Sequence, residues 1–189
     1  QRDVDALLVH TPENILYLSG YQTPGYYAYQ CLLITHLHDP VLLIRDTEKG
    51  NAFAYSWLDD YMFYYDTESP AEATSKALAE CSISNTTVGL EMGSWFLTAR
   101  VYKDLQKQNS NIRWVDASEA VEKCRARKSP QEIEYIQCAV TAAEAGMKAA
   151  IEVAREGKTD NDVAAALNFA MIEAGGEYPA LGPFVAVGK

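Results

Sequence analysis

The sequence is poor in histidine and in basic residues, which limits the functions open to it. It has three histidines, and 16 lysines and arginines stand against 26 aspartates and glutamates, giving a net charge of −10. Such an acidic chain repels phosphate backbones and anionic membranes, so nucleic-acid binding and membrane-surface binding are disfavoured. No stretch approaches the ~20 apolar residues of a membrane span, and the opening QRDVDALLVH lacks the order of a signal peptide. We therefore expect a soluble, cytoplasmic protein.

Cysteine spacing gives no sign of a zinc site or of a disulfide framework. The four cysteines lie far apart, with no Cys-x-x-Cys pair and no histidine at zinc-finger distance. Each has apolar neighbours, as in YQCLLI and YIQCAV, which favours small buried thiols over disulfides. We therefore expect buried thiols at Cys31, Cys81, Cys124 and Cys138.

Short apolar runs alternate with helical patterns along the first part of the chain. Such alternation is typical of an α/β fold with a largely buried sheet. Two of the runs flank the turn residues His36, His38 and Asp39-Pro40, which favours an antiparallel hairpin at this point over a metal site. Strands are expected at 5–10, 30–36, 40–45, 87–91 and 112–115, and helices at 12–18, 47–58, 70–80 and 96–106. The helix at 70–80 is expected to begin with a capping box made by Ser69, Pro70 and Glu72.

After the last of these strands, the pattern predicts two amphipathic helices. The first begins at Ser129, where Glu132 completes a capping box, and the second begins at Thr159, an N-cap with Asp162 at N3, and ends at Gly175-Gly176. Both helices carry apolar stripes that need a partner surface. The run 180–187 predicts one strand, which cannot bury those stripes alone. We therefore expect this second domain to be incomplete in the chain.

His10 and Glu91 each stand at the end of a predicted strand, where α/β folds often carry functional groups. General acid–base catalysis needs a positioned pair of titratable groups, and nucleophilic catalysis needs a nucleophile beside a base. The sequence offers neither residue a visible partner. A structural role is the preferred interpretation for both, and a functional role stays open as the alternative for each.

Three ordered segments of the chain resemble the creatinase/prolidase family. DALLVHTPENILYLSGY resembles the strand and N-I-x-Y-L-(S/T)-G segment near the start of the family's sequence. RKSPQEIEYIQCAVTAAEAGMKAA resembles the Lys-Ser-x-x-Glu-Ile entry to its catalytic pita-bread domain. EGKTDNDVAAALNFAMIEAGGEYPALGPFVAVG resembles the next helix and the first catalytic-domain strand. The resemblance covers nearly the whole chain, and it is strongest toward the ectoine-hydrolase and Xaa-Pro dipeptidase branch.

This resemblance implies a fold and a domain organisation. Residues 1–123 would form a creatinase N-terminal-like (ribonuclease H-like) three-layer α/β domain with a mixed sheet. Residues 124–189 would begin the α+β pita-bread catalytic domain with its first helices and strand.

The resemblance also implies a homodimeric hydrolase that cleaves a C–N (amide-type) bond of a small substrate, such as an Xaa-Pro dipeptide or ectoine. Peptidase members hold two divalent metal ions (Mn, Co or Zn), whereas creatinase-like members use a histidine and carboxylates without metal. Both sets of catalytic residues lie beyond Lys189, so we expect no catalytic residue and no metal ligand in this chain. The alternative is a catalytically inactive family module that serves dimerisation or partner binding.

Two segments, TPGYYAYQ and GGEYPA, carry the candidate substrate-binding residues. The resemblance implies that the first loop faces the active site of the partner subunit. Phenols there can hydrogen-bond a small polar substrate while their rings exclude water. The glycines of the second segment let the backbone approach a ligand closely. The candidate substrate-binding residues are Tyr26, Tyr27, Tyr29, Glu177 and Tyr178. The alternative for the tyrosines of the first segment is packing in the core, and the alternative for Glu177 is a solvated acid in a loop.

Overall fold

The computed structural model of the chain describes residues 4–186. It consists of two compact units, Gln1–Ala126 and Arg127–Lys189. The boundary expected from the sequence, between residues 123 and 124, falls inside helix α5 (Ala120–Ala126) at the end of the first unit.

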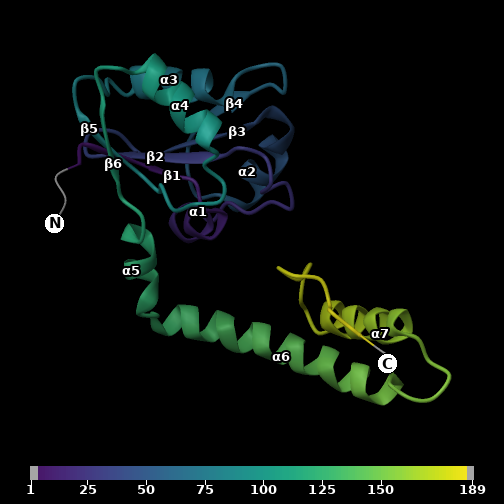
Figure 1. Cartoon of the computed structure of the whole chain (residues 1–189). Coiled ribbons are helices and arrows are strands. Elements are labelled where there is room, and N and C mark those ends of the chain that lie inside the picture. Colours follow the sequence, from purple (N-terminus) through teal and green to yellow (C-terminus); the bar gives the residue numbers. More distant parts are fainter. Residues whose placement is uncertain (1–3, 187–189) are drawn as a thin grey trace. The chain divides into compact units, whose positions relative to one another are not determined.

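The first unit is built on a six-stranded mixed sheet (Figure 1). The strand order is β4-β3-β2-β1-β5-β6. The pairs β1–β2 and β2–β3 are antiparallel, and the remaining neighbours run parallel. The predicted hairpin is thus confirmed, with Cys31 opposite Leu43 and Leu33 opposite Val41. The strands are β1 (Ala6–Val9), β2 (Cys31–Thr35), β3 (Val41–Arg45), β4 (Asp60–Tyr64), β5 (Thr87–Leu90) and β6 (Arg113–Asp116).

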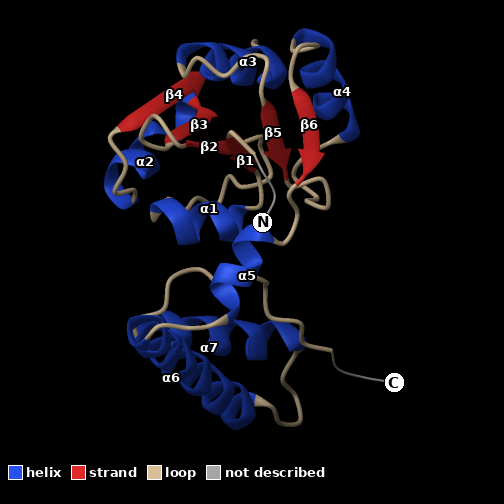
Figure 2. Ribbon diagram, turned by 90° about the vertical axis from the view of Figure 1, so that its left-hand side faces the viewer, coloured by secondary structure: helices blue, strands red, loops and turns tan. Residues whose placement is uncertain are grey.

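Helices cover both faces of this sheet, which makes the unit a three-layer α/β domain as predicted. Figure 2 shows α3 (Pro70–Glu80) and α4 (Ala99–Gln108) on one side, and α1 (Pro12–Ser19) and α2 (Lys49–Tyr55) on the other. Each face has its own buried core. The α3 side holds Leu8, Leu33 and Leu78, whereas the α1 side holds Val9, Ile15 and Leu32. Successive residues of β1 and of β2 therefore serve opposite faces, as a pleated strand requires.

Local sequence explains where α1 ends. Gly20 adopts φ 73°, a left-handed conformation that favours glycine, and a Cβ there would lie 2.8 Å from the carbonyl oxygen of Tyr55. The hydroxyl of Ser19 donates to the carbonyl of Ile15 (2.6 Å) and accepts from the backbone N–H of Tyr21 (3.1 Å). This end of the helix directs the chain into the loop that carries the candidate tyrosines.

Three predictions about the helices of the first unit need correction. The predicted helix at 47–58 is a short 3-10 turn, Asp46–Glu48, followed by α2, which ends at Tyr55. The helix predicted from residue 96 begins at Ala99, because Thr98 acts as its N-cap and accepts from Val101 N. Helix α3 begins at Pro70 as expected, but Ser69 makes no side-chain capping bond.

The second unit contains α6 (Pro130–Val153) and α7 (Asp160–Glu173), and both begin with the predicted capping boxes. The two helices pack closely because small residues line their contact. A Cβ on Gly146 would lie 2.5 Å from Cγ of Met171, and Ala142 and Ala150 are buried one turn to either side. The strand predicted at 180–187 is not formed at 180–186, where the backbone pairs with no other strand of the described chain; residue 187 lies outside the described residues.

The prediction of four buried thiols holds for two cysteines. Cys31 and Cys81 are buried, whereas Cys124 and Cys138 are exposed. Cys138 lies one helical turn before Ala142 in α6, and α7, with 14 residues against 24, ends before it can cover that turn. The seven-residue α5 buries Val121 and leaves Cys124 exposed. Apolar sequence neighbours predict burial only where a second element covers the same helix face.

Candidate functional site

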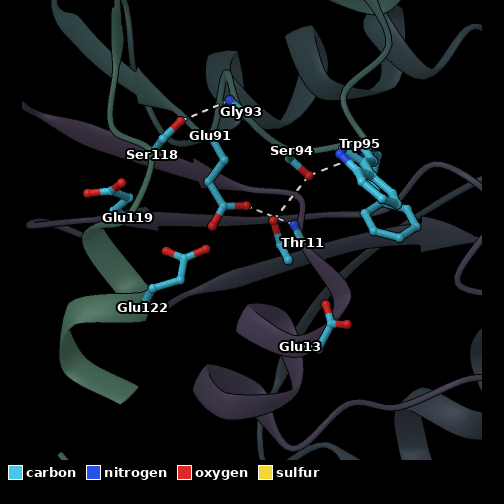
Figure 3. Close-up of a pocket in the computed structure, with 10 residues that line it drawn as sticks. Thr11, Glu13, Glu91, Gly93, Ser94, Trp95, Ser118, Glu119 and Glu122 are labelled. Atoms are coloured by element: carbon cyan, nitrogen blue, oxygen red, sulfur yellow. Dashed lines mark hydrogen bonds between the residues drawn. The ribbon is translucent and has the colours of Figure 1, made fainter. Parts of the chain in front are cut away.

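A pocket of about 460 Å³ lies at the carboxyl ends of three neighbouring parallel strands, β1, β5 and β6 (Figure 3). Open α/β sheets commonly bind ligands at this edge. The segments after these strands supply its walls. The lining residues are Thr11, Glu13, Glu91, Gly93, Ser94, Trp95, Phe96, Ser118, Glu119 and Glu122.

Glu91, which follows β5, forms the buried floor of the pocket. Its Oε2 accepts hydrogen bonds from the backbone N–H groups of His10 (2.7 Å) and Thr11 (2.8 Å). Its Oε1 accepts from Nδ2 of Asn14 (2.5 Å). Three donors compensate the burial of the carboxylate, which leaves 3 % of the residue exposed. The structure thus supplies the partners that the sequence did not show, and they give Glu91 a structural role.

Asn14 is the second buried residue of this network and is fully enclosed. Besides Glu91, its Nδ2 donates to Oε1 of Glu122 (2.9 Å), and its Oδ1 accepts from Nη1 of Arg125 (2.6 Å). One amide therefore joins α1, the end of β5 and α5. The asparagine of the NILYLSG segment is needed because an amide offers donors and an acceptor at one position.

Hydroxyl groups order the rim of the pocket. Thr11 Oγ1 donates to Ser94 Oγ (3.0 Å), which also accepts from the backbone N–H of Phe96 (3.2 Å). On the opposite side, Ser118 Oγ accepts from Gly93 N (2.9 Å), as Figure 3 shows. These bonds fix the segment that carries Trp95, whose side chain is 94 % exposed.

The tyrosine loop, residues 21–29, adjoins this pocket. The ring centroid of Tyr26 lies 6.1 Å from that of Phe96 in the pocket wall, in an edge-to-face arrangement, and 6.5 Å from that of Tyr27. Tyr27 is 77 % exposed. Two regions that the sequence suggested separately, the tyrosines and the end of β5, therefore lie side by side in one unit.

Tyr29 points inward from the same loop. Its phenol shares a hydrogen bond with Oγ1 of Thr74 (2.8 Å) and lies 3.3 Å from Nε2 of His10. Burial raises the pKa of Tyr29 well above its usual value, so the phenol stays neutral. Burial also lowers the pKa of the fully enclosed His10 to about 4, so its ring is neutral near pH 7. Both side chains support the loop from within the fold.

Glu177 and Tyr178 lie in the second unit, in the segment after α7. Both are exposed, and Gly175 beside them adopts φ 92°. They belong to a different unit from the tyrosine loop and the pocket.

Chemically, the pocket offers negative charge and aromatic surface to a ligand. Its exposed carboxylates, Glu13, Glu119 and Glu122, attract positive charge, and Trp95 and Phe96 offer aromatic surface to an apolar or cationic group. Its ten lining residues include no histidine, cysteine or lysine. Within residues 4–186, no group of three or more His, Cys, Asp or Glu side chains is arranged to hold a metal ion. Across the same residues, no helix is long and apolar enough to cross a membrane.

Sequence reasoning missed Asn14 and Glu122 as parts of the site. The pattern offered one signal for Asn14, a polar residue inside the apolar spacing of a short helix. For Glu122 it offered none, because exposed helical glutamates are common and only the fold brings this one to Asn14.

Comparison with known proteins gives two family matches. Residues 1–127 match the creatinase/prolidase N-terminal domain, and residues 134–189 match metallopeptidase family M24.

Individual relatives agree with these matches. The chain is 31% identical to an ectoine hydrolase of Halomonas elongata, over all of this chain and 52% of that protein. It is 35% identical to an uncharacterised hydrolase/peptidase of Sinorhizobium fredii, over 95% of this chain and 48% of that protein. The prolidase structure from Pyrococcus horikoshii superimposes with a TM-score of 0.70 and 27% identity, covering 90% of this chain and 44% of that one. The chain spans about half the length of the relatives that it matches.

Proposed function

The chain belongs to the creatinase/prolidase family, as its sequence motifs predicted, and from that premise we propose that the whole protein is a hydrolase. Its reaction is the attack of water on an amide-type carbon of a small substrate. Ectoine and Xaa-Pro dipeptides are the two substrate classes suggested by the ectoine hydrolase and prolidase relatives. The observation that carries this proposal is the joint match to the N-terminal and M24 families along one chain.

The part of the protein in this chain contributes substrate contacts and not the reacting groups. We assign those contacts to Tyr26 and Tyr27 in the first unit and to Glu177 and Tyr178 in the second. The exposed phenols of the first pair, beside the aromatic wall of the pocket, support this assignment. Tyr29, whose phenol is bonded to Thr74, supports the loop beneath them.

The M24 match implies divalent metal ions in the whole protein, and we propose Mn, Co or Zn for them. A pair of such ions activates water and polarises an amide carbonyl. Residues 4–186 do not provide a ligand set for this centre. We therefore place the catalytic step on residues of the whole protein that are not among those of this chain. A histidine–carboxylate pair in the same part of the protein would carry out the hydrolysis without metal.

A catalytically inactive module for dimerisation or partner binding is the second candidate. Exposed apolar residues of the second unit favour it, including Ile133, Ile136 and Val140 on α6 and Phe169 and Ile172 on α7. Under either candidate we expect the whole protein to be a cytoplasmic homodimer, as the family resemblance implies.

Hydrolysis assays of the full-length protein decide between the two. Xaa-Pro dipeptides and ectoine are offered to the protein as purified, after chelation, and after Mn²⁺ is restored. Turnover of one substrate supports the hydrolase, and its loss on chelation supports the metal form. Removing both phenol hydroxyls (Y26F/Y27F) is expected to raise KM several-fold. The control is Y17F, at an exposed tyrosine of α1, which is expected to leave KM unchanged. Absence of hydrolysis under all three conditions favours the inactive module.

A further inference from the structure

The tyrosine loop rests on one carboxylate, that of Glu48. The Thr23 hydroxyl donates a hydrogen bond to Oε2 of Glu48, and Nδ2 of Asn51 donates to the same oxygen (2.9 Å). Glu48 is half-buried and precedes α2 directly, so its position is set by a helix and not by the loop itself. A side chain on a regular element thus reaches up to a segment that has no regular structure of its own.

Gly25 shows how closely the loop lies on this carboxylate. A Cβ at Gly25 would be 2.6 Å from Oε1 of Glu48, so a side chain there would have to displace the Glu48 carboxylate. Gly25 does not adopt a left-handed φ, so the requirement for glycine is one of space. Its backbone N–H also donates to Oγ1 of Thr23 (2.9 Å), which closes a small network around Glu48.

The two ends of the loop are held separately. Tyr21 is buried in the core at the start of the loop, and its pKa is raised by burial and by the nearby charge of Glu48. At the other end, the phenol of Tyr64 donates to the carbonyl of Tyr29 (2.6 Å). Between these ends, Thr23 and Gly25 lie against Glu48, and Thr23 also accepts from Asn51 of α2, immediately before Tyr26 and Tyr27.

We propose that Glu48 is a positioning residue for substrate binding, because its carboxylate holds the Thr23–Gly25 segment and thereby sets the direction in which Tyr26 and Tyr27 project beside the pocket. This proposal rests on the proposed function, in which those two tyrosines contact the substrate. Ordering a binding loop in advance removes the entropic cost of ordering it on binding. Glu48 acts through the loop, so its loss weakens binding without touching the reacting groups.

Amide hydrogen exchange tests the anchor in the 189-residue chain. In E48Q and E48A, the hydrogen-bonded amides of Gly25 and Ala28 are expected to exchange at least about tenfold faster, while those of β1 to β3 keep their protection. G25A in the native background is expected to have the same effect, because its Cβ displaces the Glu48 carboxylate. In the E48A background G25A adds nothing further. E72Q, at an exposed glutamate of α3, is the matched control. Unchanged exchange at Gly25 and Ala28 in both Glu48 variants overturns the proposal.

Kinetics of the full-length enzyme test the role in binding. With whichever substrate the native enzyme hydrolyses, E48Q is expected to raise KM about five-fold or more and to leave kcat within two-fold, the pattern of lost uniform binding. The double variant E48Q/N51D swaps the amide and the carboxylate between the two positions, so that a donor again faces an acceptor. This variant is expected to bring KM most of the way back to the native value. A native KM in E48Q, despite faster exchange, overturns the proposal. If the native enzyme hydrolyses nothing, the proposed function fails together with the substrate role, and exchange alone decides whether Glu48 anchors the loop.

Discussion

Oε2 of Glu91 lies 2.7 Å from the backbone nitrogen of His10, although 81 positions separate the two residues in the chain. The bond joins the ends of two parallel strands at the pocket floor. Because the same carboxylate also accepts from Thr11 and Asn14, three hydrogen-bond donors compensate its buried charge.

Replacing Glu91 by glutamine is expected to destabilise the chain by about 2–4 kcal/mol. Either orientation of the new amide directs an NH₂ group at an N–H donor of His10, Thr11 or Asn14. The free energy of unfolding from urea titration measures the effect, and E72Q on the surface of α3 provides the matched control. A loss below about 0.5 kcal/mol in E91Q would show that the network contributes little to stability.

The pKa of His10 predicts how stability depends on pH. Its folded value of about 4 lies below the unfolded value of 6.5, so the unfolded chain binds the proton more readily. The contribution of the neutral His10 ring to the free energy of unfolding is fully present above pH 6.5 and is lost as pH falls toward 4. A lowering of this size corresponds to about 3 kcal/mol. Unfolding free energies at pH 7, 6, 5 and 4 are expected to fall more steeply in the native chain than in H10Q, with exposed His38 replaced in the control H38Q. Parallel curves for the native chain and H10Q would contradict this prediction.

One substitution, glycine to alanine, is expected to have opposite effects at two helical positions. In G146A the new Cβ overlaps the side chain of Met171 between α6 and α7. This overpacking is expected to lower the free energy of unfolding by about 1–3 kcal/mol. In G50A nothing lies within 4 Å of the new atom, and α2 gains up to about 1 kcal/mol of helix propensity. Amide exchange in α7 and in α2 reports the two changes separately. Equal protection of α7 in G146A and the native chain would argue against the close packing of these helices.

Cysteine labelling is expected to divide the four thiols into two pairs. A thiol reagent added to the native chain is expected to modify Cys124 and Cys138 within minutes and to leave Cys31 and Cys81 unmodified. Burial raises the pKa of Cys31 to about 12, which also keeps its reactive thiolate scarce. Mass spectrometry after proteolysis identifies the modified residues, and labelling in urea gives the fully accessible reference. Rapid native labelling of Cys31 would contradict the buried position in the sheet.

Much of the fold could be predicted from the sequence, because aliphatic runs mark buried strands. Five strands and most helices were found in this way, and the two capping boxes at Ser129 and Thr159 located the helices of the second unit. Strand β4 was missed, since DYMFY is aromatic and begins with an acid. It is an edge strand whose residues are mostly half-buried, and its pattern therefore lacks the aliphatic signal of a central strand.

Less of the candidate site could be predicted, because its contacts join residues that are distant in sequence. Glu91 was found from its place at a strand end, but its partners His10 and Asn14 are brought to it only by the pairing of β1 with β5. Glu48 gave no signal at all. Its importance depends on the gap left by Gly25, and such a fit exists only in three dimensions.

The contacts of Asn14 set an order in time for the assembly of the first unit. Asn14 is made early in synthesis, yet its partners are residues 91, 122 and 125, the last of them 111 positions later. If Asn14 is buried before Arg125 has left the ribosome, its Oδ1 lacks the hydrogen bond that the Arg125 guanidinium donates in the complete unit. Helix α1 can form sooner, but the complete network around Asn14 is a late event that waits for nearly the whole of the unit. A nascent chain whose exposed part ends before residue 125 should contain a formed sheet and an incomplete pocket. Amide exchange on ribosome-stalled chains of increasing length would show this order.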